Sequence, residues 1–220
     1  MKNLKTLRSL FVIILLPLLV FIGCSESKNE TSKSDKKDVV SASNKGKKLA
    51  VSPESKLEWV GKKVTGEHHG TVDINKGELF TDNGKLTGGS FEINFATIKN
   101  LDIKDTASNA KLTGHLKSDD FFSAEKFPLG KFDITSATSL SDGSGNNYLI
   151  KGNLTVKGIT KEISFPANVN ITDDKTTATA DFKIDRTTWD IKYGSGKFFE
   201  KLGDKMISDD INIKLNIAAK

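Results

Sequence analysis

The chain has 220 residues, of which 28% are charged and 8% aromatic, and its formal net charge is +5 at pH 7. The positive excess lies in the first 52 residues, which hold ten basic and four acidic side chains, against 23 basic and 24 acidic ones in the remainder. Because nucleic-acid binding needs a basic surface on the folded domain, this distribution argues against a nucleic-acid partner.

The N-terminus is organised like an export signal. Three basic residues precede the apolar run Leu10–Ile22, which is shorter than the roughly 20 residues of a transmembrane helix. The run ends in Gly23-Cys24, a junction that resembles the lipobox of bacterial lipoproteins, although Phe21 replaces the usual leucine. We therefore expect residues 1–23 to be a signal peptide and Cys24 to carry a lipid. The alternatives are an uncleaved anchor or a buried thiol.

Residues 24–52 are rich in Ser, Lys and Asn and contain no aromatic side chain. Such a segment cannot bury enough apolar surface to offset the entropy lost on ordering. We predict that it is a flexible tether and that the folded domain covers 53–220. The expected location is the bacterial cell envelope, with the lipid on Cys24 in a membrane, preferably the outer membrane, on its periplasmic side or at the cell surface.

From Pro53 onward, apolar and polar residues alternate, which is typical of antiparallel strands with one buried face. Turn residues such as Asn83-Gly84 and Asp173-Asp174 separate the runs. Only two segments have a helical pattern, 106–118 and a short piece near 198–202. The alternation predicts an all-β fold of about eight antiparallel strands, either closed as a lipocalin-like barrel or folded as a sandwich. The expected inward residues include Leu57 and Trp59; Phe91, Ile93 and Phe95; Phe132 and Ile134; Leu154 and Val156; Ile163, Phe165, Ala167, Val169 and Ile171; Ala178, Ala180, Phe182 and Ile184; and Ile211, Ile213, Leu215 and Ile217.

Five ordered blocks between Ser55 and Lys220 resemble the YceI-like polyisoprenoid-binding proteins. The blocks are 55–63 with Gly66, His68 and Gly70; 115–122 with Phe127, Pro128 and Phe132; 152–161; Asp185-Arg186 with Trp189 and Ile191; and Gly203-Asp204. The resemblance implies an eight-stranded antiparallel lipocalin-like barrel with one or two short helices. It also implies that the barrel encloses a long apolar chain and performs no chemistry.

The candidate ligand-binding residues combine the inward apolar positions with polar residues expected at the barrel mouth. Apolar pockets with few polar groups suit lipid-like ligands, whereas the alternative is a dry core packed by the same side chains. Phe121 and Phe122 flank the expected helix, which is placed to cap one mouth. The full set is Trp59, His68, Phe91, Ile93, Phe95, Leu112, His115, Leu116, Phe121, Phe122, Phe132, Leu154, Val156, Phe165, Phe182, Ile184, Arg186, Trp189 and Ile213.

The polar candidates do not form a recognisable catalytic or metal site. His68 and His69 are adjacent and face opposite sides of a strand, His115 lies far along the chain, and there is no cysteine ligand, so we expect no metal. His68 or His115 is expected to make a polar contact at the barrel mouth. Arg186 suits a phosphate or another charged headgroup, with a salt bridge to a nearby aspartate, such as Asp185 or Asp190, as the alternative.

Catalytic and nucleotide-binding motifs are also missing from the sequence. Gly194-Ser195-Gly196-Lys197 lacks the upstream glycine and the following Ser or Thr of a P-loop, so no cofactor is expected. The leading hypothesis is therefore a non-enzymatic lipoprotein that binds a polyisoprenoid or another long apolar lipid. The alternative is a structural or stress-related lipoprotein with a side-chain-filled barrel and a protein partner, and an enzyme ranks third.

Overall fold

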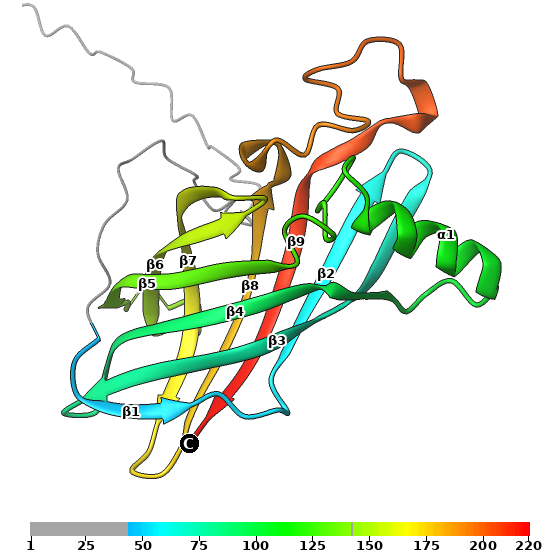
Figure 1. The fold of residues 1–220 in the computed structure, drawn as a ribbon. Helices are drawn as coiled ribbons and strands as arrows, with labels where there is room; N and C mark the ends of the chain where they lie inside the picture. Colours follow the sequence, from blue (N-terminus) through cyan, green and yellow to red (C-terminus); the bar gives the residue numbers. More distant parts are fainter. Residues whose placement is uncertain (1–43, 142) are drawn as a thin grey trace, which may run out of the picture.

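The computed structural model describes residues 44–141 and 143–220. Strands dominate this part of the chain, with one α-helix and two 3₁₀ turns between them (Figure 1). In chain order the elements are β1 (Lys47–Ala50), β2 (Lys56–Lys63), β3 (Gly66–Asp82), β4 (Lys85–Asn100), α1 (Thr106–Lys117), β5 (Leu129–Ser139), β6 (Tyr148–Val156), β7 (Ile159–Ile171), β8 (Thr176–Asp185), η1 (Arg186–Trp189), η2 (Gly203–Lys205) and β9 (Ile207–Ala219).

Eight of these strands close into an antiparallel barrel. Each strand from β2 to β9 pairs with the next strand in sequence, and β9 pairs back with β2. Helix α1 lies in the connection between β4 and β5, and η1 lies in the connection between β8 and β9. The short β1 adds to the outer part of β3 beside this circuit. Closure leaves each main strand with a partner on both sides, which removes most exposed edges. The predicted eight-stranded barrel is therefore confirmed, and the sandwich alternative is wrong.

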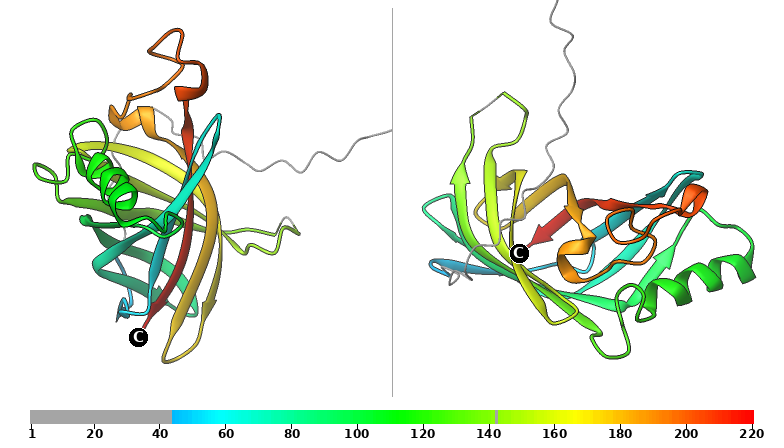
Figure 2. Two further views of the ribbon diagram at one scale, coloured as in Figure 1. Left: turned by 90° about the vertical axis from the view of Figure 1, so that its right-hand side faces the viewer. Right: turned by 90° about the horizontal axis from the view of Figure 1, so that it is seen from above.

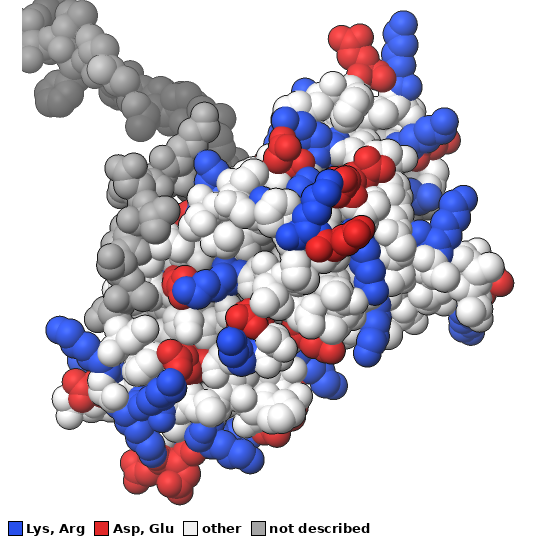
Figure 3. All heavy atoms as spheres, viewed as in Figure 1, with Lys and Arg blue, Asp and Glu red and all other residues white. Residues whose placement is uncertain are grey.

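The alternation in the sequence explains which side chains face inward. Ile163, Phe165 and Ala167 on β7 are all at most 4% exposed, whereas the alternating residues Ser164, Pro166 and Asn168 are partly or fully exposed. On the outer face, basic and acidic side chains are interspersed (Figure 3). Because side chains on a strand alternate between its two sides, one apolar parity is enough to fill the interior.

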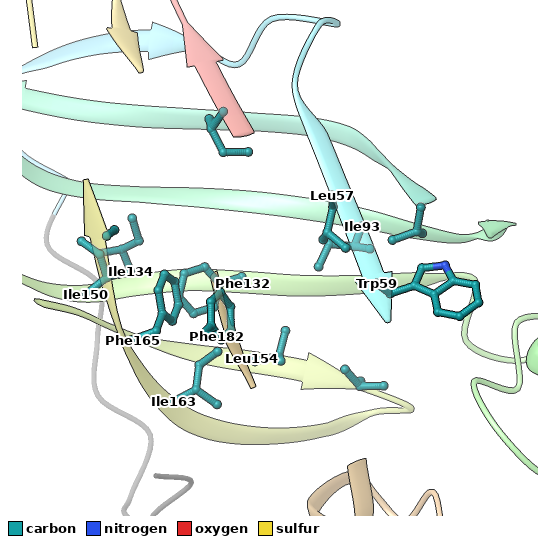
Figure 4. Close-up of a cluster of buried hydrophobic side chains, with 14 of the residues drawn as sticks. Leu57, Trp59, Ile93, Phe132, Ile134, Ile150, Leu154, Ile163, Phe165 and Phe182 are labelled. Carbon is teal, nitrogen blue, oxygen red and sulfur yellow. The ribbon is translucent and has the colours of Figure 1, made fainter. Parts of the chain in front are cut away.

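An aromatic row crosses the middle of the barrel. Phe91 and Phe132 have ring centroids 6.4 Å apart, Phe132 and Phe165 5.7 Å, and Phe165 and Phe182 only 4.0 Å with nearly parallel planes. These rings come from β4, β5, β7 and β8, and the last three lie together in Figure 4. A Cβ at Gly152 would approach Phe132 Cζ to 2.4 Å, so the lack of a side chain there makes room for the row.

The connections divide between two ends of the barrel. The β2–β3, β4–β5, β6–β7 and β8–β9 connections, with α1, lie at one end, which we call the helix end. The β1–β2, β3–β4, β5–β6 and β7–β8 connections lie at the other, which we call the terminal end because the described chain starts there and Lys220 ends there. Two further views show α1 and the long β8–β9 connection on the same side of the barrel (Figure 2).

The helices differ in part from the sequence prediction. The helix expected at 106–118 is α1, whose N-terminus is capped by Asp105 Oδ1, which accepts a hydrogen bond from Ser108 N at 2.8 Å. No helix forms at 198–202, where the exposed side chains have no core to pack against. The two 3₁₀ turns, η1 and η2, lie on either side of that segment.

The expected tether boundary also needs correction. Strand β1 lies inside the 24–52 segment, and its Leu49 is only 2% exposed. The Ala50 backbone exchanges two hydrogen bonds with Lys220, at 2.9 and 3.0 Å, and Ser52 N donates to Ala218 O at 2.7 Å. The folded domain therefore includes 47–52, held by partners from the far end of the chain. The predicted signal peptide, Cys24 and the rest of the predicted tether, up to residue 43, lie outside the described residues.

Candidate ligand-binding cavity

The barrel interior contains a cavity of about 190 Å³. All eight barrel strands and α1 contribute to its wall, and nearly all contributed side chains are apolar. The wall extends from Leu86, Val169 and Ile217 near the terminal end to Gly61 and Ile207 at the helix end. The cavity therefore follows the length of the barrel.

The size of the cavity limits what fits without rearrangement. A cavity of about 150 Å³ takes up benzene, whereas pockets for drug-sized ligands measure about 300–1,000 Å³. At 190 Å³, the interior admits a short apolar group directly. A long chain fits only if side chains such as the stacked Phe165 and Phe182 change rotamer.

Most sequence-predicted site residues belong to this wall. His68, Leu112, His115 and Trp189 do not, although Trp189 and His115 lie close to residues that do. The predicted residues that line the cavity are Trp59, Phe91, Ile93, Phe95, Leu116, Phe121, Phe122, Phe132, Leu154, Val156, Phe165, Phe182, Ile184, Arg186 and Ile213.

The two histidines predicted at the mouth each pair with an aspartate instead of facing the cavity. His68 Nδ1 lies 2.7 Å from Asp102 Oδ2 at the helix end, where His68 pairs with the wall residue Gly61. His115 Nε2 lies 3.0 Å from Asp120 Oδ2. The His115 and Tyr193 rings pack in a T-shaped arrangement, with their centroids 4.6 Å apart. Both histidines therefore lie at the helix end, each held by an aspartate rather than lining the cavity.

Asp102 organises the surface beside that mouth. Besides His68, it accepts hydrogen bonds from the His69 backbone N at 2.9 Å and from Asn100 Nδ2 at 2.5 Å. Partial burial raises the pKa of Asp102, but the hydrogen bonds from His68, His69 and Asn100 outweigh it and lower the pKa from 3.8 to about 2. The carboxylate therefore ties the end of β4 to β3 in its ionised form.

Arg186 is a structural residue in this arrangement. Its side chain is 1% exposed, and its Nε, Nη1 and Nη2 donate to the backbone oxygens of Ser208 at 3.0 Å, Ile191 at 2.8 Å and Ile207 at 3.2 Å. Nη2 also lies 3.4 Å from Asp209 Oδ1. These bonds leave the Arg186 guanidinium little capacity for the predicted contact with a headgroup. The predicted alternative of an ion pair is correct in kind, but the partner is Asp209 rather than Asp185 or Asp190.

The two tryptophans differ in their hydrogen bonding. Trp189 is 1% exposed, and its Nε1 donates to Leu154 O at 3.1 Å. It fills the region where β7 and β8 separate, since these strands pair only through Asn168–Ile171 and Thr176–Thr179. Trp59 lines the cavity, and its buried Nε1 has no partner among the described residues.

Several wall residues were not among the predicted site residues. Half of them were already identified as inward by the alternation, so that pattern alone contained the signal. Gly61 and Ile207 continue the inward parity of β2 and β9 at the helix end, whereas Ser208 on β9 is off that parity and had no such signal. The missed residues are Leu57, Gly61, Val72, Ile74, Leu79, Leu86, Ile98, Ile134, Ile150, Ile163, Ala167, Val169, Ala178, Thr179, Ala180, Ile207, Ser208, Ile211, Leu215 and Ile217.

Residues 44–141 and 143–220 contain no group of three or more His, Cys, Asp or Glu side chains arranged to hold a metal ion. Within the same ranges, no helix has the length and apolar character needed to cross a bilayer.

A closed eight-stranded antiparallel barrel around an apolar cavity places the protein among the lipocalin-like β-barrels. Residues 50–219 match the model of the YceI-like domain, and the chain therefore belongs to the YceI-like family. The predicted family is confirmed by this match.

Curated relatives share part of this sequence. A UPF0312 protein of Shewanella denitrificans is 33% identical over 92 residues, which are 42% of this chain and 44% of the relative. A UPF0312 protein of Pseudomonas putida is 28% identical over 102 residues, which are 46% and 49% of the two chains. The chain thus matches slightly less than half the length of these relatives.

Solved structures resemble the whole domain. BcnA of Burkholderia cenocepacia has a TM-score of 0.59 at 20% identity, and the match covers 76% of this chain and 97% of BcnA. A polyisoprenoid binding domain from Saccharophagus degradans has a TM-score of 0.58 at 13% identity, with coverages of 80% and 99%. At these identities the likeness shows the fold alone.

Proposed function

We propose that the protein binds a long apolar lipid of the polyisoprenoid type inside its barrel and carries out no reaction on it. The observation that carries this proposal is the apolar cavity lined by all eight strands of a YceI-like domain. The polyisoprenoid binding domain from Saccharophagus degradans, with the same fold, supports the chemical class of the ligand. Storage, protection and carriage of the lipid are all compatible with such a cavity.

Chain length is expected to control affinity. Burial of each methylene group contributes about 0.8 kcal/mol before the costs of association and ordering are subtracted. Since Arg186 is already bonded to four protein oxygens, it has little capacity left for a charged headgroup. Affinity should therefore rise with the number of isoprene units until the cavity is full.

Native mass spectrometry of the gently extracted protein tests the proposal. We expect an apolar molecule to copurify, and an Ala180→Trp variant, with the new ring inside the cavity, to lose it while remaining folded. The matched control is Asn216→Trp, on the outer face of neighbouring β9, which should keep the ligand. An empty protein that also fails to take up added polyprenyl chains would refute lipid binding.

A second function is favoured by the size of the cavity. At about 190 Å³, with Phe165 and Phe182 stacked across the middle, the barrel resembles one filled largely by its own side chains. A structural or stress-related lipoprotein with a protein partner needs no more space than this. Uptake of added polyprenyl chains separates the two functions, because only a ligand-binding barrel rearranges to admit them.

We further propose that the protein is exported and anchored in the cell envelope through a lipid on Cys24. The Gly23-Cys24 junction after the apolar run supports this proposal. Mass spectrometry of the membrane-extracted chain should find Cys24 acylated at the mature N-terminus, and Cys24→Ser should retain residues 1–23. A mature wild-type chain without acyl mass on Cys24 would end this proposal and leave lipid binding unaffected.

A further inference from the structure

The exposed large apolar side chains gather at one end of the barrel. In 44–141 and 143–220 all of them lie at the helix end, in the connections or at the first residue of a strand, with exposures of 37–60%. None lies in the described connections of the terminal end. The set consists of Val64, Leu101, Phe127, Leu129, Tyr193, Phe198, Phe199 and Met206.

Five of these residues lie on two adjoining connections, and we call them the apolar tip: Val64, Tyr193, Phe198, Phe199 and Met206. Val64 N donates to Met206 O at 3.2 Å, which joins the β2–β3 turn to the β8–β9 connection. The backbone N groups of Phe198 and Phe199 both donate to the same oxygen, that of Ser195. The two segments also lie side by side at the barrel end in Figures 1 and 2.

The charge around the apolar tip differs from that of the terminal end. The segments Lys62–Glu67 and Asp190–Met206, which carry the tip, contain six lysines and four acidic residues. The connections 51–55, 82–85, 140–147 and 172–175 at the terminal end contain two lysines and five acidic residues. Lysines beside exposed aromatic rings favour a surface with an apolar interior and anionic headgroups.

The apolar tip adjoins the helix-end mouth of the cavity. Met206 directly precedes Ile207, a wall residue, and Val64 lies three residues after Gly61, another. The Tyr193 ring lies 5.7 Å from that of Phe121, which also lines the cavity. A surface that covers the tip would therefore also meet the mouth.

The chain is long enough for the tip to reach the membrane that holds its own N-terminal segment. Nineteen residues lie between Cys24 and Asn44, and twenty peptide steps span at most about 65–70 Å. The longest strand limits the barrel to less than that, since the 17 residues of β3 extend about 55 Å.

We infer that the apolar tip docks on the bilayer that holds the N-terminal segment of the chain, with the cavity mouth against the lipid. Exposed rings on two protruding connections suit insertion among headgroups, where aromatic side chains and lysines are both stable. A second copy of the chain is the main competing occupant. The inference rests on the proposed membrane anchoring of the N-terminal segment, and it holds whatever molecule occupies the barrel.

Two matched nitroxide labels test the docking. Glu200→Cys places a label beside the tip, and Asp174→Cys places one in the β7–β8 turn at the terminal end; both residues are exposed acids. The full chain is purified from membranes and reconstituted in phosphatidylethanolamine–phosphatidylglycerol vesicles, with the unsubstituted chain as the labelling blank. Collision rates are measured with oxygen, which concentrates in lipid, and with a nickel chelate, which stays in water.

We expect the oxygen-to-nickel ratio to be about threefold or more higher at position 200 than at 174. Adding Phe198→Ser and Phe199→Ser to Glu200→Cys should lower the ratio to the value at 174, with an unchanged circular dichroism spectrum. Equal ratios at both ends, or a high ratio that survives the serine substitutions, would overturn the inference. Dipolar broadening between labels at 200 that grows with protein density would overturn it in favour of a second copy. Because no cargo is added, failure here leaves the proposed function untouched.

Discussion

The two ends of the barrel are built differently. At the terminal end, Leu49, Thr176 and Ala219 are at most 2% exposed, and Ala50 and Lys220 exchange backbone hydrogen bonds. At the helix end, the β4–β5 and β8–β9 connections are long and carry exposed aromatic side chains. One end is sealed by packing, and the other presents apolar surface around the mouth of a cavity.

We expect the two ends to contribute differently to stability and to ligand entry. Tight turns occur at both ends, with φ angles of 49° and 71° at Asn83-Gly84 and of 50° and 73° at Lys157-Gly158, so the ends differ through the long β4–β5 and β8–β9 connections. Long connections tolerate the movement that a ligand needs for entry. We expect stability to depend most on the sealed end and on the few buried groups that hold the open end in place.

Arg186→Ala is expected to lower the free energy of unfolding most, and it tests whether every part of the helix end contributes little to stability. Arg186→Ala removes a side chain that is 1% exposed, and it leaves Asp209 and three backbone oxygens without their donor. Loss of one partner of such a buried pair costs about 3–5 kcal/mol of unfolding free energy. Urea denaturation measures it.

Lys197→Ala is the matched control for Arg186. Lys197 Nζ lies 2.6 Å from Asp185 Oδ2 and 3.4 Å from Asp209 Oδ2, but its side chain is 56% exposed. Removal of a solvent-exposed ion pair changes stability by about 0–1 kcal/mol. Similar losses for the two variants would mean that Arg186 acts only as a surface charge.

Leu79 tests the sealed end. It is 2% exposed on β3, and Leu79→Ala should cost about 2–5 kcal/mol because it leaves a cavity in a packed region. The comparison is Phe198→Ala in the apolar tip, where the side chain is 49% exposed and the expected change is at most about 0.5 kcal/mol. An equal loss at both positions in urea melts would remove the proposed difference between the ends.

How far the sequence predicts these features depends on how local their causes are. The alternation in Ile163–Ile171 and Ile211–Ile217 predicts barrel walls because inward and outward positions follow from strand geometry alone. The polar partners of Arg186 lie as far away as Asp209, so its buried role was not visible from adjacent residues. Likewise, Leu49 is buried through contacts with the far end of the chain, and the tether prediction missed it.

The tryptophans provide a smaller contrast within the cavity region. Trp189→Phe removes the Nε1 donor to Leu154 O in a fully packed site, and loss of that bond should cost about 1–2 kcal/mol. Trp59→Phe removes a buried donor that has no partner among the described residues, so its cost should be smaller by about 1 kcal/mol. Thermal denaturation of both variants checks the order. Equal or reversed costs would contradict these assignments.

The smallest expected effect on stability concerns Asp102, whose ionisation should make the stability of the helix end depend on pH. Its pKa is lowered from 3.8 to about 2 in the folded protein. A carboxyl group with a depressed folded pKa stabilises the protein fully above its unfolded pKa, and this contribution is lost as pH falls through the folded pKa. Stability contributed by Asp102 should therefore be present above about pH 4 and disappear towards pH 2.

Solvent reduces the size of this contribution, since the Asp102 side chain is 25% exposed. We expect about 1 kcal/mol rather than the full value of the pKa difference. Asp102→Asn should remove that share of the stability change between pH 4 and pH 2 in urea melts. Asp174→Asn is a suitable control, because Asp174 is an exposed residue of the β7–β8 turn at the terminal end. Amide exchange should also show faster opening at His69 and Asn100 in acid while Leu49 and Ala219 stay protected. Equal acid sensitivity at both ends would show that Asp102 does not hold the helix end in particular.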